Sequence, residues 1–257
     1  MADRLRGKRA LVTGASRGIG KAIALAFAAE GASVAVAGRD AALVEETCDE
    51  VRRGGGVAVG VLGDVADETD AEQIVQSSAE GLGGLDILVN NAGIDANGWH
   101  PVHEWPVEEF DRIMAVNLRG PFLVSRFAVP HLLRAGGGSI LHISSVCATT
   151  VWAGDCAYDI SKAALNMLSD HLAVEYGAQG IVSNTLMPGV IRTDLHERVM
   201  EGMDDGRAFE RELLARHPIG RFGTVEEVAQ SAVFLCSGAA PFLTGANVAI
   251  DGGYSRV

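Results

Sequence analysis

The sequence contains few lysines and few aromatic residues. Lysine occurs at only three of the 257 positions, and phenylalanine, tryptophan and tyrosine together account for 5% of the chain. Aliphatic side chains must therefore fill most of the core, within a hydrophobic content of 48%. Acidic residues outnumber basic ones by 33 to 21, so the formal net charge is −12, which argues against nucleic acid as a partner.

The sequence also lacks the patterns of membrane, disulfide and metal proteins. No apolar run is long enough to span a bilayer, and residues 1–6 contain no apolar signal core. The four cysteines form no Cys-x-x-Cys pair, and the seven histidines are scattered. We therefore expect a cytoplasmic protein with no membrane partner, no structural zinc and no catalytic metal.

A glycine-rich loop near the N-terminus lies between a predicted strand and a predicted helix. Residues 8–12 form an apolar run, residues 21–30 are strong helix formers, and Thr13-Gly14-Ala15-Ser16-Arg17-Gly18-Ile19-Gly20 connects them. Glycines at such a junction allow close approach of the backbone to a pyrophosphate, which the helix N-terminus attracts. A purely structural turn is the alternative. The context predicts a dinucleotide site formed by Gly14, Ser16, Arg17, Gly18, Ile19 and Gly20.

A tyrosine and a lysine form the second pattern. Tyr158 and Lys162 are four residues apart, which places both on one face of a helix, and Ser145 precedes the tyrosine at the end of an apolar run. An ammonium about 5 Å from a phenol, at an effective dielectric near 20, lowers the phenol pKa by roughly two units. The spacing therefore predicts an acid–base tyrosine. An ordinary surface pair is the alternative, and the glycine loop favours the catalytic interpretation.

Apolar runs alternate with helical patterns along the chain. We predict strands at about 8–12, 33–37, 57–62, 85–89, 139–143, 181–187 and 247–250. The alternation predicts a single-domain α/β protein over residues 1–257, with a Rossmann-type doubly wound parallel sheet flanked by helices. Ligands bind at the carboxyl ends of such strands, where the glycine loop and Ser145 fall. Residues 190–220 interrupt the pattern, and we predict that they form a substrate lid.

These motifs together resemble the short-chain dehydrogenase/reductase family, in its compact branch, over nearly the whole chain. Beyond the glycine loop, the match rests on Asp64-Val65, Asn90-Asn91-Ala92-Gly93, Val116-Asn117-Leu118, Pro188-Gly189, Ile191, Thr193 and Asp251-Gly252-Gly253. The resemblance implies a catalytic set of Asn117, Ser145, Tyr158 and Lys162. It also implies that the cofactor contacts Asp64, Val65, Asn91, Ala92, Gly93, Tyr158, Lys162, Pro188, Gly189, Ile191 and Thr193.

The resemblance further implies hydride transfer between a nicotinamide cofactor and a ketone or secondary alcohol, for example a 3-oxoacyl thioester, a simple ketone or a sugar. Ser145 would bind the substrate oxygen and Tyr158 would exchange its proton. Lys162 would lower the pKa of Tyr158 and hold the ribose, and Asn117 would support a water relay. One alternative is an NAD-linked alcohol or sugar dehydrogenase that works oxidatively. Another is a non-catalytic nucleotide sensor on the same fold.

The end of the second predicted strand favours NADP(H). Gly38 stands where NAD-preferring relatives place an aspartate, which would bind the ribose hydroxyls and repel a phosphate. Arg39 follows, and its guanidinium offers a planar fork of donors to a phosphate, with Arg17 available from the other side. If Arg39 stacks on the adenine instead, or if Asp40 reaches the ribose, NAD(H) stays usable.

Two further expectations concern surfaces. The helices predicted at 107–133 and 157–176 carry small and apolar residues on more than one face, which predicts a homotetramer or a homodimer. Trp99 and Trp152 either line an apolar wall of the substrate pocket or pack under the lid.

Overall fold

The computed structural model describes residues 3–96, 98–193 and 206–257. Within them, seven strands form one parallel sheet in the order β3-β2-β1-β4-β5-β6-β7. The strands are β1 (Arg9–Thr13), β2 (Ser33–Gly38), β3 (Val57–Leu62), β4 (Ile87–Asn90), β5 (Gly138–Ile143), β6 (Ile181–Pro188) and β7 (Asn247–Ile250). The predicted doubly wound parallel sheet is confirmed. The strand order reverses between β1 and β4, and ligands bind beside such a switch point.

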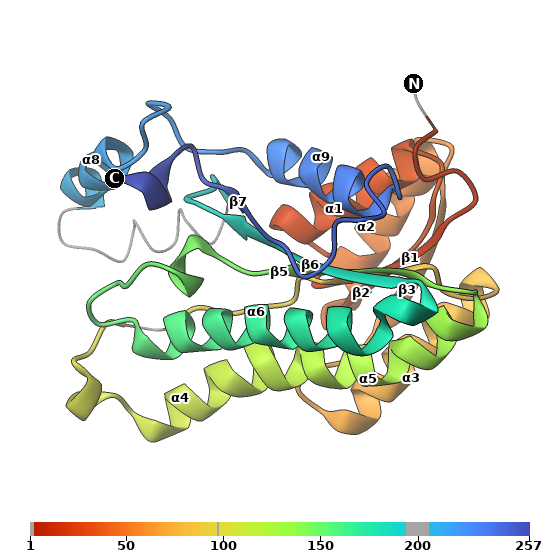
Figure 1. Ribbon diagram of the computed structural model, residues 1–257, viewed down its shortest axis with the longest axis horizontal. Coiled ribbons are helices and arrows are strands. Elements are labelled where there is room, and N and C mark those ends of the chain that lie inside the picture. Colours follow the sequence, from red (N-terminus) through yellow and green to blue (C-terminus); the bar gives the residue numbers. More distant parts are fainter. Residues whose placement is uncertain (1–2, 97, 194–205) are drawn as a thin grey trace.

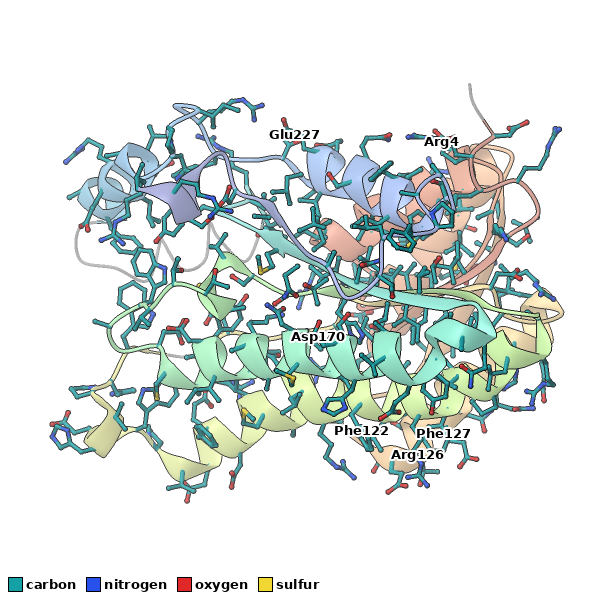
Figure 2. All side chains as sticks on the ribbon, viewed as in Figure 1. Arg4, Phe122, Arg126, Phe127, Asp170 and Glu227 are labelled. Carbon is teal, nitrogen blue, oxygen red and sulfur yellow. The ribbon has the colours of Figure 1, made fainter. Side chains whose placement is uncertain are left out.

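Helices cover both faces of the sheet (Figure 1). One layer contains α1 (Gly18–Ala29), α2 (Ala41–Arg53) and α9 (Val225–Cys236), and the other contains α3 (Glu68–Leu82), α4 (Val107–Met114), α5 (Gly120–Arg134) and α6 (Cys156–Tyr176). Strand β1 serves both cores, because Ala10 and Val12 pack toward the first layer and Leu11 toward the second. Figure 2 accordingly shows Arg4 and Glu227 on one side of the molecule and Phe122, Arg126 and Phe127 on the other.

The pattern of the sequence predicted most elements but not helix α9. The bounds of β3 and β7 agree with the expected ranges, and the other strands differ by one or two residues at their ends. No helix was predicted at 225–236, although the segment begins with a capping box. The Thr224 hydroxyl accepts from the Glu227 backbone N–H, and the Glu227 carboxylate accepts from the Thr224 N–H.

A turn of π-helix, Ala115–Arg119, joins α4 to α5. It contains the predicted catalytic residue Asn117, whose side chain is fully buried. One extra residue in a helical turn removes the regular hydrogen-bond spacing at that point, and such turns are frequent at functional sites. The two helical stretches predicted over 107–133 therefore form one helical segment, which the π turn interrupts at Asn117.

Candidate active site

The glycine loop packs backbone against backbone at the carboxyl end of β1. Gly14 and Gly18 have φ values of +62° and +56°, in the left-handed region that favours glycine. A Cβ at Gly20 would lie 2.3 Å from both the Gly14 carbonyl oxygen and Asn91 Nδ2. Only glycine fits at position 20 without a shift of the loop. Of the three glycines, Gly20 therefore shows the tightest steric requirement.

Asn91 holds this loop in place from the end of β4. Its side-chain amide donates to the carbonyl oxygens of Thr13 and Gly14 at 2.9 and 3.1 Å. The Thr13 hydroxyl accepts from the backbone N–H groups of Asn91 and Ala92 at 3.0 and 3.1 Å. The segment after β4 therefore fixes the loop after β1, which the sequence motif alone did not indicate.

The N-terminus of α1 fits a bound pyrophosphate. Arg17 occupies the N-cap position in an extended conformation, and its side chain makes no capping hydrogen bond. The first N–H groups of an uncapped helix are available to an anion, which the helix dipole also favours. A Cβ at Gly18 would lie 3.9 Å from Thr193 Cγ2, so the segment after β6 reaches the same loop. Two predicted cofactor segments, far apart in sequence, thus come together.

The other predicted cofactor residues lie at the same edge of the sheet. Asp64 and Val65 lie one residue beyond the end of β3, and Val65 is buried against Gly120. Pro188 ends β6, and the Gly189 N–H donates to the Ile250 carbonyl oxygen at 3.0 Å. Ile191, buried, pairs with Gly223 through an isolated bridge.

Ser145, Tyr158 and Lys162 come together where β5 ends and α6 begins. Ser145 caps a short 3-10 turn, and its hydroxyl accepts from the Cys147 N–H at 3.2 Å. Lys162 Nζ lies 5.4 Å from the centroid of the Tyr158 ring. The same ammonium donates to the Ile143 carbonyl oxygen at 3.0 Å. The structure therefore places these three predicted catalytic side chains together.

Asn117 joins the loop after β4 to helix α6. Its amide accepts from the Ile94 N–H and donates to the Ile94 carbonyl oxygen, both at 2.9 Å. It also donates to Ser161 Oγ at 3.1 Å, and Ser161 in turn donates to the Tyr158 carbonyl oxygen at 2.7 Å. A Cβ at Gly93 would lie 3.4 Å from Asn117 Oδ1 and 3.5 Å from Lys162 Nζ. The four predicted catalytic residues thus share one neighbourhood.

Burial dominates the acid–base properties of this neighbourhood. It lowers the pKa of Lys162 to about 8, and it raises the pKa of Tyr158 well above its usual value, although a hydrogen bond with Ser145 opposes the rise. The direction for Tyr158 differs from the expected lowering by Lys162. The spacing of the two residues revealed their proximity but not the burial around the phenol, which is the largest cause of the rise in its pKa.

An aromatic wall and three aspartates complete the surroundings of Tyr158. The rings of Trp99 and Trp152 lie 6.2 Å apart, and that of Phe209, on α8 (Gly206–Ala215), lies 5.2 and 5.9 Å from them. Asp95 follows β4, whereas Asp155 is the N-cap of α6 and Asp159 lies in its first turn, next to Tyr158. Sequence reasoning singled out none of the three aspartates, although their proximity to Tyr158 and to residues 90–93 was a usable signal.

Part of the predicted lid lies outside the described residues, namely 194–205. Of the remainder, α8 contributes Phe209 to the aromatic wall. Both tryptophans therefore contact the segment that was predicted to be a lid, and its closure stays a prediction. None of the described helices is long and apolar enough to cross a membrane.

The fold and this edge of the sheet define a dinucleotide-binding α/β protein of Rossmann type. A family model described as enoyl-(acyl carrier protein) reductase matches residues 14–255. The chain is 39% identical over 257 residues to 2-(R)-hydroxypropyl-CoM dehydrogenase of Xanthobacter autotrophicus, with 96% of this chain and 98% of the relative covered.

Two solved structures have the same fold. A putative NAD(P)-dependent gluconate 5-dehydrogenase from Beutenbergia cavernae with bound NADP matches with a TM-score of 0.92 and 36% identity, over 100% of both chains. A 7α-hydroxysteroid dehydrogenase complexed with NADH matches with a TM-score of 0.90 and 35% identity, over 98% of this chain and 96% of that chain. The chain belongs to the short-chain dehydrogenase/reductase family, and it is an NAD(P)-dependent oxidoreductase.

Proposed function

We propose that Ser145, Tyr158 and Lys162 interconvert a secondary alcohol and a ketone, with Asn117 as their support. The observation that carries the proposal is the convergence of these side chains with the glycine loop at one edge of the sheet. When bound, a nicotinamide cofactor supplies or accepts the hydride. The presence of all four predicted catalytic residues favours an enzyme over a nucleotide sensor on the same fold.

Each residue has a role that follows from its position. The Tyr158 hydroxyl donates a proton to the carbonyl oxygen in reduction and removes it from the alcohol in oxidation. The Ser145 hydroxyl, already hydrogen-bonded to Tyr158, holds the same oxygen. The Lys162 ammonium stabilises negative charge on Tyr158 when that hydroxyl gives up its proton. Asn117 holds the loop after β4 against helix α6 through its side-chain hydrogen bonds.

A panel of ketones and secondary alcohols, each offered with NADH, NADPH and their oxidised forms, tests this proposal. We expect turnover of at least one carbonyl–alcohol pair by the wild type, and its loss in Tyr158→Phe. Cofactor binding without any turnover across the panel would favour the sensor. Turnover only with the oxidised cofactors would favour the oxidative dehydrogenase.

We propose that NADP(H) is the preferred cofactor. A Cβ at Gly38 would lie 2.9 Å from Val44 Cγ2, so an aspartate at this position requires a shift. Asp40 is occupied as the N-cap of α2, where its carboxylate accepts from the N–H groups of Ala42 and Leu43 at 3.0 and 3.2 Å. These hydrogen bonds make the Asp40 carboxylate less available to bind the ribose.

Arg39 is exposed at the same edge, and its guanidinium lies 3.4 Å from Asp64 Oδ2. A surface pair of this kind contributes at most about 1 kcal/mol, so a phosphate can replace it. A 2′-phosphate would accept a fork of hydrogen bonds from Arg39, which is the stronger arrangement. The relatives contain both cofactors, since one structure holds NADP and the other NADH. The preference therefore rests on Gly38, Arg39 and Asp40 of this chain.

We further propose that the enzyme assembles as a homotetramer through α5 and α6. Phe122 on α5 is 49% exposed and Met167 on α6 is 57% exposed, which is unusual for such large apolar side chains. Phe122 lines an apolar groove on the outer face of the helix layer, together with Met114, Leu118 and Leu168. Figure 2 shows Phe122 on this outer face. A light-scattering mass equal to that of one chain, 26.8 kDa, at micromolar concentration would contradict the proposal.

A further inference from the structure

Asp155, at the N-cap position of helix α6, and three residues of that helix form one stripe beside the predicted reaction centre. Asp155, Tyr158, Asp159 and Lys162 are spaced i, i+3, i+4 and i+7, which places them on a single helical face. Two of the four are the predicted catalytic pair, and the other two are carboxylates. Both aspartates are at least nine-tenths buried, with 7% of Asp155 and 9% of Asp159 exposed.

Neither aspartate is fully satisfied by the protein. Asp155 Oδ1 and Asp159 Oδ1 are buried oxygens without a hydrogen-bond partner. Asp155 occupies the N-cap position of α6, yet its carboxylate makes no capping hydrogen bond. An aspartate at an N-cap ordinarily accepts from the first turn of its helix. The Asp155 carboxylate therefore does not take the stabilising role that its position offers.

A third carboxylate faces the same stripe. Asp95 lies in the loop after β4 and acts electrostatically on Asp155, Asp159 and Tyr158. Burial and the two neighbouring aspartates raise the pKa of Asp155 to about 8, and no described basic group offsets that rise. Lys162 offsets part of the shift at Asp95, but its ammonium donates to the Ile143 carbonyl oxygen. Buried carboxylates are ordinarily paired with a cation, so this cluster lacks one.

The aromatic wall closes the other side of the cluster. The Trp152 N–H donates to Asp159 Oδ2 at 2.9 Å, which ties the wall to the stripe. His100 N–H and Trp105 Nε1–H both donate to the Gly154 carbonyl oxygen, at 3.0 and 3.1 Å, so the loops after β4 and β5 are held together. Arg216 lies over Trp152 but is paired with Glu212. Trp99, 42% exposed, presents an aromatic surface of the kind that attracts cations.

We propose that the substrate of this enzyme is an amino alcohol or amino ketone whose cationic nitrogen, a protonated or quaternary amine, binds between Asp155, Asp159, Asp95 and the aromatic wall. The inference rests on the proposed alcohol–ketone interconversion and adds the charge of the substrate to it. The amine takes no part in the redox step and serves to orient the carbinol carbon toward Tyr158. Asp155 is the residue that sets this specificity, because a bound cation favours its ionised form whereas an anion opposes that ionisation.

The test uses three secondary alcohols that differ in one group. They are (hydroxypropyl)trimethylammonium, its neutral isostere with a tert-butyl group in place of the trimethylammonium group, and the corresponding carboxylate. We expect kcat/KM for the cation to exceed that for the neutral isostere by at least about tenfold, because a cation within contact distance of a buried carboxylate is strongly favoured. The carboxylate should be the poorest of the three.

Variants separate Asp155 from the net charge of the protein. Asp155→Asn should lower the ratio of cationic to neutral kcat/KM by at least about tenfold. Glu80→Gln removes one negative charge from an exposed position on α3 and should leave the ratio unchanged. A ratio that stays the same in Asp155→Asn would overturn the assignment of Asp155.

A binding measurement gives a readout that does not depend on turnover. Titration of the enzyme with (hydroxypropyl)trimethylammonium should change the tryptophan fluorescence, through Trp99 and Trp152, at concentrations where the neutral isostere has no effect. Equal kcat/KM for cation and isostere, a preference for an uncharged polyol, or a requirement for added Mg²⁺ or Ca²⁺ at the aspartates would overturn this inference alone. Absence of turnover across the whole substrate panel would overturn the proposed function beneath it.

Discussion

The glycine loop is held by contacts between backbone atoms, whereas the surroundings of Asp155 are formed mostly by side chains. The loop is fixed by contacts that leave no room for a Cβ at Gly20 and by the Asn91 amide. The surroundings of Asp155 consist of carboxylates and rings from three separate segments, with two carboxylate oxygens lacking partners. Both regions lie at the same edge of the sheet. A binding site formed by backbone atoms accepts one shape of ligand. In a binding site formed by side chains, an amino-acid substitution can change which ligand is bound.

The substitution with the largest expected effect is at Tyr158, where the two regions meet. Tyr158→Phe keeps the ring and removes the exchangeable proton, so we expect kcat to fall by about 10³-fold or more. Cofactor affinity, measured by fluorescence titration, should change little, since the glycine loop is untouched. Residual activity above a few per cent would show that another group transfers the proton.

Gly20→Ala tests the backbone side. Because the new Cβ would meet Gly14 and Asn91 at 2.3 Å, the loop must shift, at a cost of about 1–3 kcal/mol or more in stability. We expect a lower Tm and a weaker cofactor affinity by at least about tenfold. Gly177→Ala is the matched control, because a Cβ there meets nothing within 4 Å and the residue has α-helical dihedrals. It should leave both measurements almost unchanged, and an equal loss in the control would remove the special status of position 20.

Arg39→Ala tests the cofactor preference at the edge of the proposed cofactor site. Loss of a fork of charged hydrogen bonds to a phosphate should lower kcat/KM for NADPH by about 10- to 100-fold, with little change for NADH. Arg53→Ala, an exposed arginine at the end of α2, is the control and should affect neither cofactor. A wild type that prefers NADH, or an Arg39→Ala variant with an unchanged preference, would contradict the assignment.

Asp155→Asn tests the side-chain region through stability. The folded-state pKa of Asp155, about 8, lies above the value of 3.8 for a solvated aspartate. The folded state therefore retains a proton that the unfolded state has lost, and wild-type stability falls as pH rises from about 4 to about 8. The asparagine variant does not undergo this loss, so its Tm should exceed that of the wild type by several degrees at pH 8 and by much less at pH 5. An advantage that does not grow with pH would mean that Asp155 is ionised in the folded enzyme.

The two regions also differ in how far the sequence predicted them. The glycine loop, Ser145, Tyr158 and Lys162 follow strand ends or helix spacings, and such patterns are local. Asn117 was predicted only through the family resemblance. The roles of Asp155 and Asp159 depend on how deeply the first turn of α6 is buried, and burial arises from segments far away in the chain. For the same reason the sequence indicated the Tyr158–Lys162 pair but gave the wrong direction for the pKa of the phenol in this structure.

Some features had a readable signal that was not used. Asp40 directly precedes a helical pattern, as an N-cap does, and Thr224 with Glu227 has the spacing of a capping box. The Arg39–Asp64 contact had no such signal, because β2 and β3 had to be paired before the two side chains could meet.

The π-helical turn at Ala115–Arg119 affects the angle between the side-chain faces of α4 and α5. Each residue of an α-helix advances the side-chain direction by about 100°, and a π turn holds one residue more than an α turn. The faces of α4 and α5 are therefore offset by about that angle from those of a continuous helix. A regular α-helix over the same residues would rotate the side chains of α4 relative to α5. The outer groove, which takes Met114 from one side of the turn and Phe122 from the other, and the buried position of Asn117 thus depend on the same π turn.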